Sequence, residues 1–317
     1  MANLLWLQGS GDNGCTISFL NAHQPDVGTL LNRYNVNLLF HPTLSPQSGK
    51  EAMELLDRYA GEDEPVDVLV VEGAVTLGPE NSGKYCLVGD RPFKDLVETF
   101  AARAGYVVAV GSCATFGGMS AAEPNPTDAR GMQFYRDKPG GFLGENFRSN
   151  SGLPVVNIPG CPAHPDWVTK TLAAVLLGLE DHLELDEFHR PKAFFQSLSH
   201  RGCSRNEFYE FGEAAHQFGE KGCLVRPLGC KGIETHADCN QRLWNNHSSK
   251  TRAGSPCVGC TEPNFPDAGS GYFFETRGLF KIPKPLGSKT IFRLPGIAFM
   301  KLATPKRLKE ENRDGPA

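Results

Sequence analysis

The stretch that decides the fold is Tyr106-Val107-Val108-Ala109-Val110-Gly111-Ser112-Cys113, a short apolar run that ends in glycine, serine and cysteine. An uninterrupted apolar run of this length is typical of a strand buried on both faces in a parallel sheet. Similar runs recur through the first 185 residues, with helical patterns between them. This alternation predicts an α/β domain with a doubly wound parallel sheet. The other expected strands are Leu4–Leu7, Asn37–Phe40, Val66–Val71 and Val155–Ile158.

Helices are expected where apolar residues recur with a spacing of about 3.6. Glu51–Tyr59 and Phe93–Ala104 show this spacing, and Pro165 suits the first turn of a helix over Trp167–Leu177. After about residue 186 the sequence becomes loop-like, and one further helix is expected near Asn206–Phe218.

Composition limits the function. A chain of 317 residues is long enough for two domains, and its net charge of −4 gives no reason to expect a nucleic-acid partner. The 35 glycines and 23 prolines indicate extensive loops. The 10 cysteines are too sparse for a disulfide scaffold of this size, yet six of them fall within residues 203–260. We therefore expect clustered cysteines to act as metal ligands.

The sequence also bears on the compartment. The N-terminal residues show no basic region followed by an apolar segment, and no stretch reaches about 18 uninterrupted apolar residues. We therefore expect neither a signal peptide nor a transmembrane helix, and a cytoplasmic protein. Membrane association through a partner is left open.

Reactive side chains follow the ends of the expected strands. Cys15 comes after the first strand, Glu72 directly follows the third, and Cys113 and Cys161 follow the fourth and fifth. Because the carboxyl ends of parallel strands meet at one edge of a sheet, these residues should converge there.

A glycine pattern, Gly9-x-Gly11-x-x-Gly14, also follows the first strand and matches the dinucleotide-binding fingerprint. That fingerprint requires an acidic residue about 20 positions later, near the end of the second strand. Here the second strand ends Leu39-Phe40-His41-Pro42, and no acid appears before Glu51. A metal-binding turn is favoured, with a plain tight turn and nucleotide binding as alternatives.

The six downstream cysteines and one histidine form a second set of candidate ligands. The segment has too little periodic apolar sequence to form its own core, and bound metal can supply folding energy instead. Zinc would take four ligands per site, whereas seven ligands divide into four plus three, as for a [4Fe–4S] and a [3Fe–4S] cluster. Iron–sulfur is favoured and zinc stays the alternative. The seven residues are His200, Cys203, Cys223, Cys230, Cys239, Cys257 and Cys260.

With these motifs in this order, the chain resembles the small subunit of nickel–iron hydrogenases over nearly its whole length. The matching stretches are Trp6-Leu7-Gln8-Gly9, Val71-Glu72-Gly73, Gly111-Ser112-Cys113-Ala114-Thr115-Phe116-Gly117-Gly118, Pro124-Asn125-Pro126-Thr127, Asn157-Ile158-Pro159-Gly160-Cys161-Pro162, Leu228-Gly229-Cys230-Lys231-Gly232 and Cys257-Val258-Gly259-Cys260-Thr261-Glu262-Pro263.

The resemblance implies a flavodoxin-like domain over residues 1–185 that holds a proximal [4Fe–4S] cluster. It implies a smaller, loop-rich domain over 186–285 with a medial [3Fe–4S] and a distal [4Fe–4S] cluster, and a C-terminal extension over 286–317. By family position, the proximal ligands are Asp12, Cys15, Cys113 and Cys161, the distal ligands are His200, Cys203, Cys223 and Cys230, and the medial ligands are Cys239, Cys257 and Cys260.

The proximal motif departs from the family pattern, since Asp12 stands where the first cysteine of Cys-x-x-Cys is expected. Either Asp12 binds iron through a carboxylate oxygen, which we favour, or it is no ligand and the cluster is incomplete. Such a substitution resembles the actinobacterial-type group of the family. The extra cysteines of the oxygen-tolerant, membrane-bound class are absent, because Gly14 and Gly118 occupy their positions.

Two residues lie outside these ligand sets. Glu72 could contact the large subunit or serve a proton route, and a hydrogen-bonded structural carboxylate is an equal alternative. Cys86 matches no ligand position and is expected to be a buried thiol.

The function that the resemblance implies is an electron relay in an uptake-type hydrogenase. The partner would be a large subunit that carries the Ni–Fe centre, in a heterodimer or a dimer of heterodimers, and electrons from H₂ would pass to an external acceptor. The alternatives are the cluster-bearing subunit of a quinone reductase-type complex and a zinc-stabilised binding protein.

Overall fold

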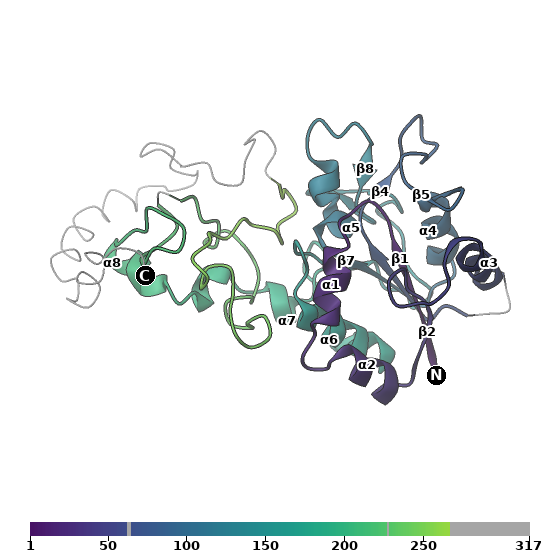
Figure 1. Cartoon of the computed structure of the whole chain (residues 1–317), viewed down its shortest axis with the longest axis horizontal. Helices are drawn as coiled ribbons and strands as arrows, with labels where there is room; N and C mark the ends of the chain where they lie inside the picture. The colour runs from purple at the N-terminus through teal and green to yellow at the C-terminus, as the bar shows by residue number, and fades with distance from the viewer. Residues whose placement is uncertain (62–64, 227, 267–317) are drawn as a thin grey trace. The chain divides into compact units, whose positions relative to one another are not determined.

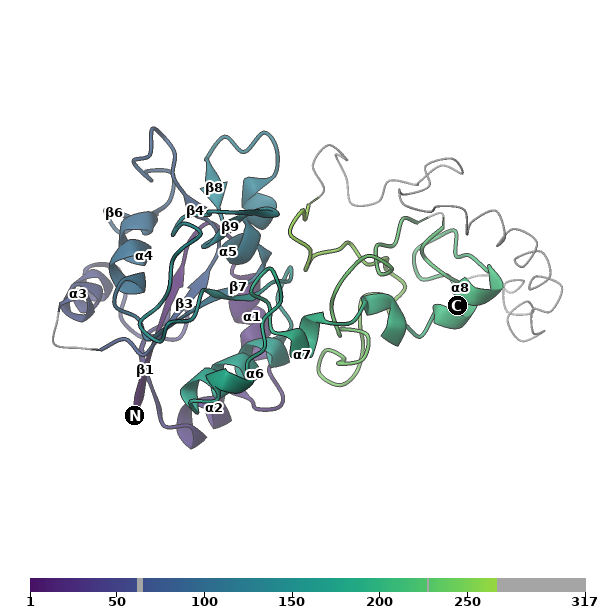
Figure 2. The same ribbon diagram turned by 180° about the vertical axis from the view of Figure 1, so that it is seen from behind.

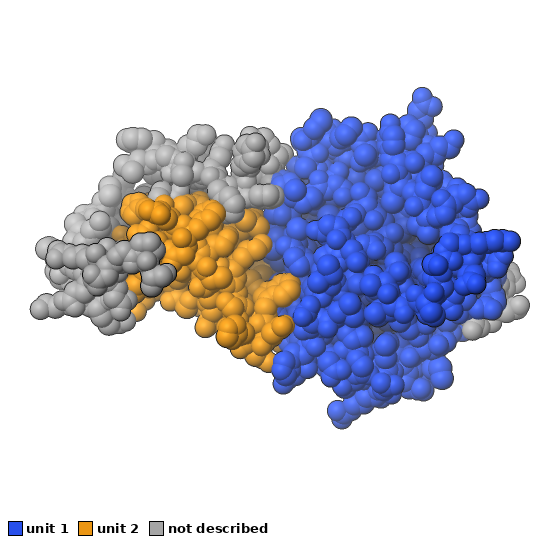
Figure 3. Space-filling model, in the orientation of Figure 1, with its two compact units in different colours: residues 1–196, 260–269 blue, residues 197–259, 270–317 orange. Residues whose placement is uncertain are grey.

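The structure is a computed structural model that describes residues 1–61, 65–226 and 228–266. The chain forms two compact units, coloured separately in Figure 3. The first contains residues 1–196 together with the segment that returns at residue 260, and the second contains residues 197–259. The expected C-terminal extension, 286–317, lies outside the described residues.

The first unit is built on a five-stranded sheet in which all neighbours run parallel (Figure 1). Its strand order, β2-β1-β3-β7-β11, is the flavodoxin-like order. The predicted fold class is confirmed, and each predicted strand forms with small shifts at its ends. The strands are β1 (Ala2–Gln8), β2 (Val36–Phe40), β3 (Val68–Glu72), β7 (Tyr106–Val110) and β11 (Val156–Ile158).

Helices cover both faces of this sheet (Figures 1 and 2). Successive side chains of a strand point to opposite faces, so Leu5 and Leu7 join the core under α3 and α4, whereas Trp6 packs against Phe19 of α1. Burial on both faces explains why these strands lack polar alternation. The helices are α3 (Gly49–Ala60) and α4 (Phe93–Ala101) on one face, and α1 (Gly14–Leu20), α2 (Val27–Arg33) and α6 (Pro165–Leu176) on the other.

Several short elements were not predicted, because strands of two residues and helices of one or two turns are too short to show a periodic pattern. Short hairpins and single helical turns occupy the loops of the first unit. They are β4 (Val75–Thr76), β5 (Leu87–Val88), β6 (Arg91–Pro92), α5 (Ser112–Phe116), η1 (Gly118–Ala121), β8 (Ala129–Arg130), β9 (Phe134–Tyr135), β10 (Lys138–Pro139), η2 (Glu180–His182) and α7 (Lys192–Phe195).

The second unit is mostly loop. Its described residues form the helical turn η3 (Ser199–Gly202), the helix α8 (Asn206–Phe211) and isolated bridges. The helix predicted over Asn206–Phe218 was wrong at its end, because Gly212 adopts the left-handed conformation (φ 73°) that terminates a helix. Within the described residues of the whole chain, no helix is both long and apolar enough to cross a membrane.

A buried histidine follows β2 in the first unit. The ring of His41 lies 4.9 Å from the Trp6 ring, centroid to centroid, and its Nδ1 accepts the N–H of Thr43 at 3.1 Å. Its Nε2 is buried without a hydrogen-bond partner among the described residues. Burial lowers the pKa of His41 to about 4. Between about pH 6.5 and pH 4, His41 is therefore protonated in the unfolded chain but neutral in the folded protein.

We therefore expect His41 to make the fold less stable as the pH falls from about 6.5 towards 4. In His41→Asn, Oδ1 can replace Nδ1 as the acceptor for Thr43, and the titration is absent. The melting temperature should drop less between pH 7.5 and pH 5 in this variant than in the unchanged protein. Equal drops in the two proteins would contradict the prediction.

Candidate functional site

Three of the expected proximal ligands lie at the carboxyl edge of the sheet. Cys15 is in the first turn of α1, Cys113 is in the first turn of α5, and Cys161 follows β11. Burial raises the pKa of the Cys15 thiol, and the nearby charges of Glu72, Cys113 and Cys161 raise it further. The structure thus brings Cys113 and Cys161 within electrostatic range of Cys15, in agreement with the convergence expected at this edge of the sheet.

Backbone amides face the sulfurs of this group. The Ala163 N–H donates to Cys15 Sγ at 3.4 Å. Burial raises the pKa of Cys113, while the N–H groups of Met119 and Ser120 donate to its sulfur and lower it. Amide dipoles aimed at sulfur favour the thiolate form that binds iron, and such bonds tune cluster potentials. A Cβ at Gly111 would lie 2.5 Å from Cys15 Sγ, so the glycine leaves the sulfur room.

Asp12 lies beside this group. Its charge raises the pKa of Cys113, and its Oδ1 accepts the Gly14 N–H at 2.9 Å. A carboxylate keeps further lone pairs after accepting one hydrogen bond. Asp12 is therefore within electrostatic range of Cys113, and it also stabilises the turn that leads into α1.

Glu72 ends β3 in a buried position. Its carboxylate accepts the Trp6 Nε1–H at 3.1 Å and the Thr16 N–H at 3.0 Å, and it also accepts the Thr16 hydroxyl. These bonds join β1, β3 and α1 directly behind Cys15. The geometry favours the structural reading, in which Glu72 holds the helix that carries a ligand.

The glycines after β1 allow close packing. A Cβ at Gly9 would lie 2.3 Å from the Phe93 ring, and one at Gly73 would lie 2.8 Å from the Gly9 backbone. This contact favours a tight turn over a nucleotide-binding loop. In the same unit, Cys86 is partly buried against the hydrophobic core.

The expected distal cysteines lie together in the second unit. Burial raises the pKa of Cys223 and of Cys230, and each of the two is also influenced by the charge of Cys203. All three sulfurs accept backbone amides: from Arg205 to Cys203 at 3.4 Å, from Val225 to Cys223 at 3.5 Å and from Cys257 to Cys230 at 3.2 Å.

His200 is held next to these cysteines by the backbone. Its N–H donates to the Gly232 carbonyl at 2.9 Å, and its ring meets Tyr209 edge to face at 4.7 Å. Burial lowers the pKa of His200, while Glu210 raises it. A neutral imidazole is the form that binds a metal.

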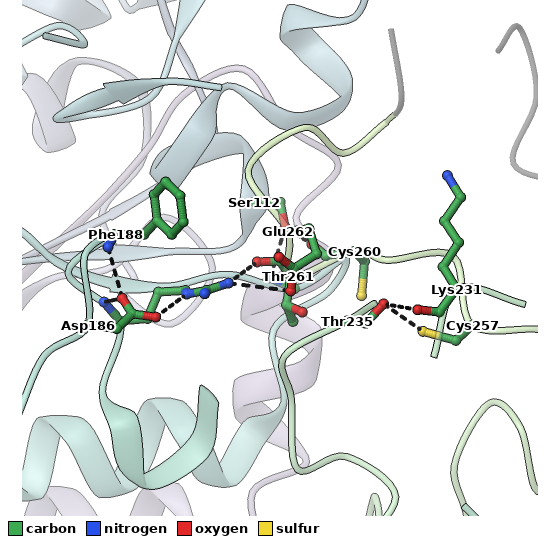
Figure 4. A network of polar contacts seen from close by, with 11 residues as sticks. Ser112, Asp186, Phe188, Lys231, Thr235, Cys257, Cys260, Thr261 and Glu262 are labelled. Atoms are coloured by element: carbon green, nitrogen blue, oxygen red, sulfur yellow. Dashed lines mark hydrogen bonds and ion pairs between the residues drawn. The ribbon is translucent and has the colours of Figure 1, made fainter. Parts of the chain in front are cut away.

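The expected medial ligands are divided between the units. Cys239 and Cys257 belong to the second unit, where their sulfurs contact Ser199 Oγ at 3.5 Å and Thr235 Oγ1 at 3.6 Å. Cys260 belongs to the first unit. Figure 4 shows the surroundings of Cys257 and Cys260.

Two residues that sequence reasoning missed organise the second unit. Arg205 donates to three backbone carbonyls: Thr251 at 2.7 Å, Glu220 at 2.6 Å and Gly222 at 2.8 Å. Its guanidinium thereby connects two loops beside Cys223, whose pKa it lowers against the effect of burial. No local pattern marks such an arginine, because its partners are distant backbone groups.

The second is Asn240, which is buried. It donates to Ser199 Oγ at 3.1 Å and accepts the hydroxyls of Ser249 at 2.5 Å and Thr251 at 2.8 Å. Ser199 contacts Cys239, and Thr251 Oγ1 lies 3.5 Å from Cys203 Sγ. One amide therefore connects the loop of a medial ligand to that of a distal ligand.

Within the described residues, no group of three or more His, Cys, Asp and Glu side chains could hold a metal ion. Thiolates around one zinc ion sit at about 2.3 Å from it, whereas a cluster distributes its ligands over several irons. The fit to clusters therefore depends on the buried and half-buried cysteines that lie within electrostatic range of their neighbours, and on the amides that face their sulfurs.

Comparison with known proteins agrees with the two-part organisation. Residues 13–175 match the family described as NADH ubiquinone oxidoreductase, 20 Kd subunit. Residues 195–273 match the family described as the C-terminal part of the NiFe/NiFeSe hydrogenase small subunit.

Individual relatives match across both parts. The F420 non-reducing hydrogenase II small subunit of Methanosarcina mazei is 41% identical, over 86% of this chain and 75% of its own length. The periplasmic [NiFeSe] hydrogenase small subunit of Desulfomicrobium baculatum is 36% identical, over 86% and 87%. The solved actinobacterial-type NiFe-hydrogenase from Ralstonia eutropha has a TM-score of 0.78 at 29% identity, over 99% of this chain and 92% of that one. The chain therefore belongs to the family of nickel–iron and nickel–iron–selenium hydrogenase small subunits, the electron-transfer partners of the subunit that holds the catalytic centre.

Proposed function

We propose that this chain relays electrons from H₂, oxidised in a large subunit, through three iron–sulfur clusters to an external acceptor, as in an uptake-type hydrogenase. The observation that carries the proposal is the gathering of buried and half-buried cysteines into two groups, one at the carboxyl edge of the sheet and one in the second unit. Each cluster would accept and pass on one electron at a time.

The proximal [4Fe–4S] cluster would be held by Asp12, Cys15, Cys113 and Cys161. Support comes from the influence of Cys113 and Cys161 on Cys15 and from the amides that face Cys15 and Cys113. Because burial raises the pKa of both thiols, metal loading must release protons from them.

In the second unit, the distal [4Fe–4S] cluster would be held by His200, Cys203, Cys223 and Cys230. The medial [3Fe–4S] cluster would be held by Cys239, Cys257 and Cys260. An imidazole in place of a thiolate raises a cluster's potential. A distal histidine would therefore draw electrons toward the exit.

The large subunit would cover the proximal ligands. Ile17 and Leu20, on the same helix as Cys15, are 57% and 44% exposed, and Met119, whose N–H faces Cys113, is 46% exposed. Apolar side chains around buried reactive groups are typical of an interface. The assembly would be a heterodimer or a dimer of heterodimers, with Glu72 supporting this face from within.

The subgroup and compartment are further proposals. Asp12 and the likeness to the Ralstonia eutropha structure support the actinobacterial type. The cysteine content supports the cytoplasm, whereas the Desulfomicrobium baculatum relative is periplasmic. Cell fractionation with an antibody to this chain decides between the two compartments.

One alternative has a specific observation in its favour. The match of residues 13–175 to a subunit of NADH ubiquinone oxidoreductase fits a quinone reductase-type complex. The second ligand group and the hydrogenase match over residues 195–273 favour the hydrogenase.

The three-cluster proposal predicts about 11 iron atoms per chain, with matching acid-labile sulfide. Metal and sulfide analysis of freshly isolated, active complex measures both. Stoichiometric zinc without labile sulfide would support the zinc-stabilised alternative and end the proposal.

Replacing the distal histidine should separate electron exit from hydrogen activation. In His200→Ala, reduction of an external dye by H₂ should slow, while H₂/D₂ exchange, which occurs on the large subunit, should persist. The exposed His247, in the same unit, supplies the control His247→Ala, which should change neither rate. Equal loss of both activities in His200→Ala would mean that the histidine serves folding.

Asp12 can be tested with three variants of the complex. Asp12→Cys should keep a four-iron cluster with a shifted potential, because thiolate is a softer donor than carboxylate. Asp12→Ala should lose an iron or recruit water. Asp12→Asn keeps an acceptor for the Gly14 N–H but removes the charge of the carboxylate. It therefore distinguishes the role of Asp12 in the turn from its role as an iron ligand. An unchanged proximal spectrum and potential in Asp12→Ala would show that Asp12 is no ligand.

A further inference from the structure

We propose that Ser112 and Arg190 are positioning residues that anchor the Cys260 segment to the loops of the proximal ligands and thereby set the electron path from the proximal to the medial cluster. The inference rests on the proposed function and uses contacts within the first unit alone. No sequence motif assigns either residue this role.

Ser112 uses its buried hydroxyl twice. Oγ accepts the Gly160 N–H at 2.9 Å and donates to the carbonyl of Cys260. The Ser112 N–H also donates to the Gly160 carbonyl at 3.0 Å. Since Ser112 precedes Cys113 and Gly160 precedes Cys161, this one side chain contacts the segments of two proximal ligands and one medial ligand. Figure 4 shows Ser112 beside Cys260.

Arg190 holds the next residues of the same segment. Its Nη1 donates to the Thr261 carbonyl at 3.0 Å and pairs with Glu262 at 3.6 Å, while its Nε donates to Asp186 at 2.8 Å. Arg190 is 3% exposed, and its guanidinium lies 5.2 Å from the Phe188 ring centroid. The buried guanidinium of Arg190 is held in one position by two carboxylates and one carbonyl. Moving away from any of them would weaken the compensation of a charge that water cannot reach.

The anchored segment has no regular structure to hold it otherwise. Residues 260–266 form turns and bends, without a helix or strand. Thr261 is nonetheless 1% exposed, so its backbone must find partners inside the protein. The bonds from Ser112 and Arg190 satisfy successive carbonyls, those of Cys260 and Thr261, and fix the backbone that presents the Cys260 thiol.

These contacts also form a continuous bonded route. It runs from Cys113 along the peptide bond to Ser112, across the hydroxyl to the Cys260 carbonyl, and on to the Cys260 side chain. Electron tunnelling is more efficient along bonded atoms than across gaps. In Ser112→Ala the route loses its hydrogen bond, and the Cys260 carbonyl and Gly160 N–H are left unsatisfied.

The test uses the complex with its large subunit, in which this chain bears Ser112→Ala, Arg190→Lys or the control Ser149→Ala. Ser149 is a buried serine of the same unit whose hydroxyl donates to the Leu153 carbonyl, away from all proposed ligands. The measurements are the electron paramagnetic resonance (EPR) signal of the oxidised three-iron cluster, its rate of reduction after H₂ is added, and H₂/D₂ exchange.

In Ser112→Ala we expect unchanged H₂/D₂ exchange, a shifted three-iron signal and slower reduction of that cluster by H₂. Arg190→Lys keeps the charge but cannot reach all its partners, so it should lower the three-iron content, and it carries the test if Ser112→Ala does not assemble. Ser149→Ala should match the unchanged complex in all three measurements.

The outcomes separate two failures. Unchanged signals and reduction rates in both Ser112→Ala and Arg190→Lys overturn the positioning role while leaving the relay intact. If the complex without any substitution gives no cluster signals at all, the proposed function is overturned, and this inference with it.

Discussion

The common direction of the five strands is the constraint on which the first unit depends. Parallel strands deliver all their carboxyl ends to one edge, so chain segments that are distant in sequence leave the sheet side by side. Cys15, Cys113 and Cys161 are neighbours for this reason. The buried Glu72 carboxylate then fixes the helix that carries Cys15, since Trp6 and Thr16 both donate to it. The parallel arrangement of the strands therefore brings together cysteines that are far apart in the sequence.

The second unit also brings together cysteines that are distant in sequence, but it has no sheet among its described residues. Its loops are held by hydrogen bonds to backbone carbonyls and to sulfur, with Arg205 and Asn240 each serving several loops. A buried network of polar groups stabilises a fold only when every group in it has a hydrogen-bond partner. Bound metal would add the stabilisation that a hydrophobic core supplies elsewhere.

The sequence predicted what depends on periodicity and on strand ends. β7 was placed at its observed bounds because an apolar run ends sharply at Gly111, and the flavodoxin-like order followed from the resemblance. The short helix α2 was missed, since seven residues show too few turns for a pattern. The roles of Ser112 and Arg190 could not be predicted either, because they bond to carbonyls of a segment distant in sequence. Whether Asp12 binds iron depends on a donor choice that neither periodicity nor its bond to Gly14 decides.

The Asn240 amide has a consequence for how the second unit folds. Asn240 accepts the hydroxyls of Ser249 and Thr251 and donates to that of Ser199, so neither the 249–251 segment nor the segment at Ser199 can order by itself without leaving buried polar groups unpaired. The loops that present Cys203 and Cys239 therefore order together. The two cysteines that these loops carry are therefore presented in one cooperative step of folding.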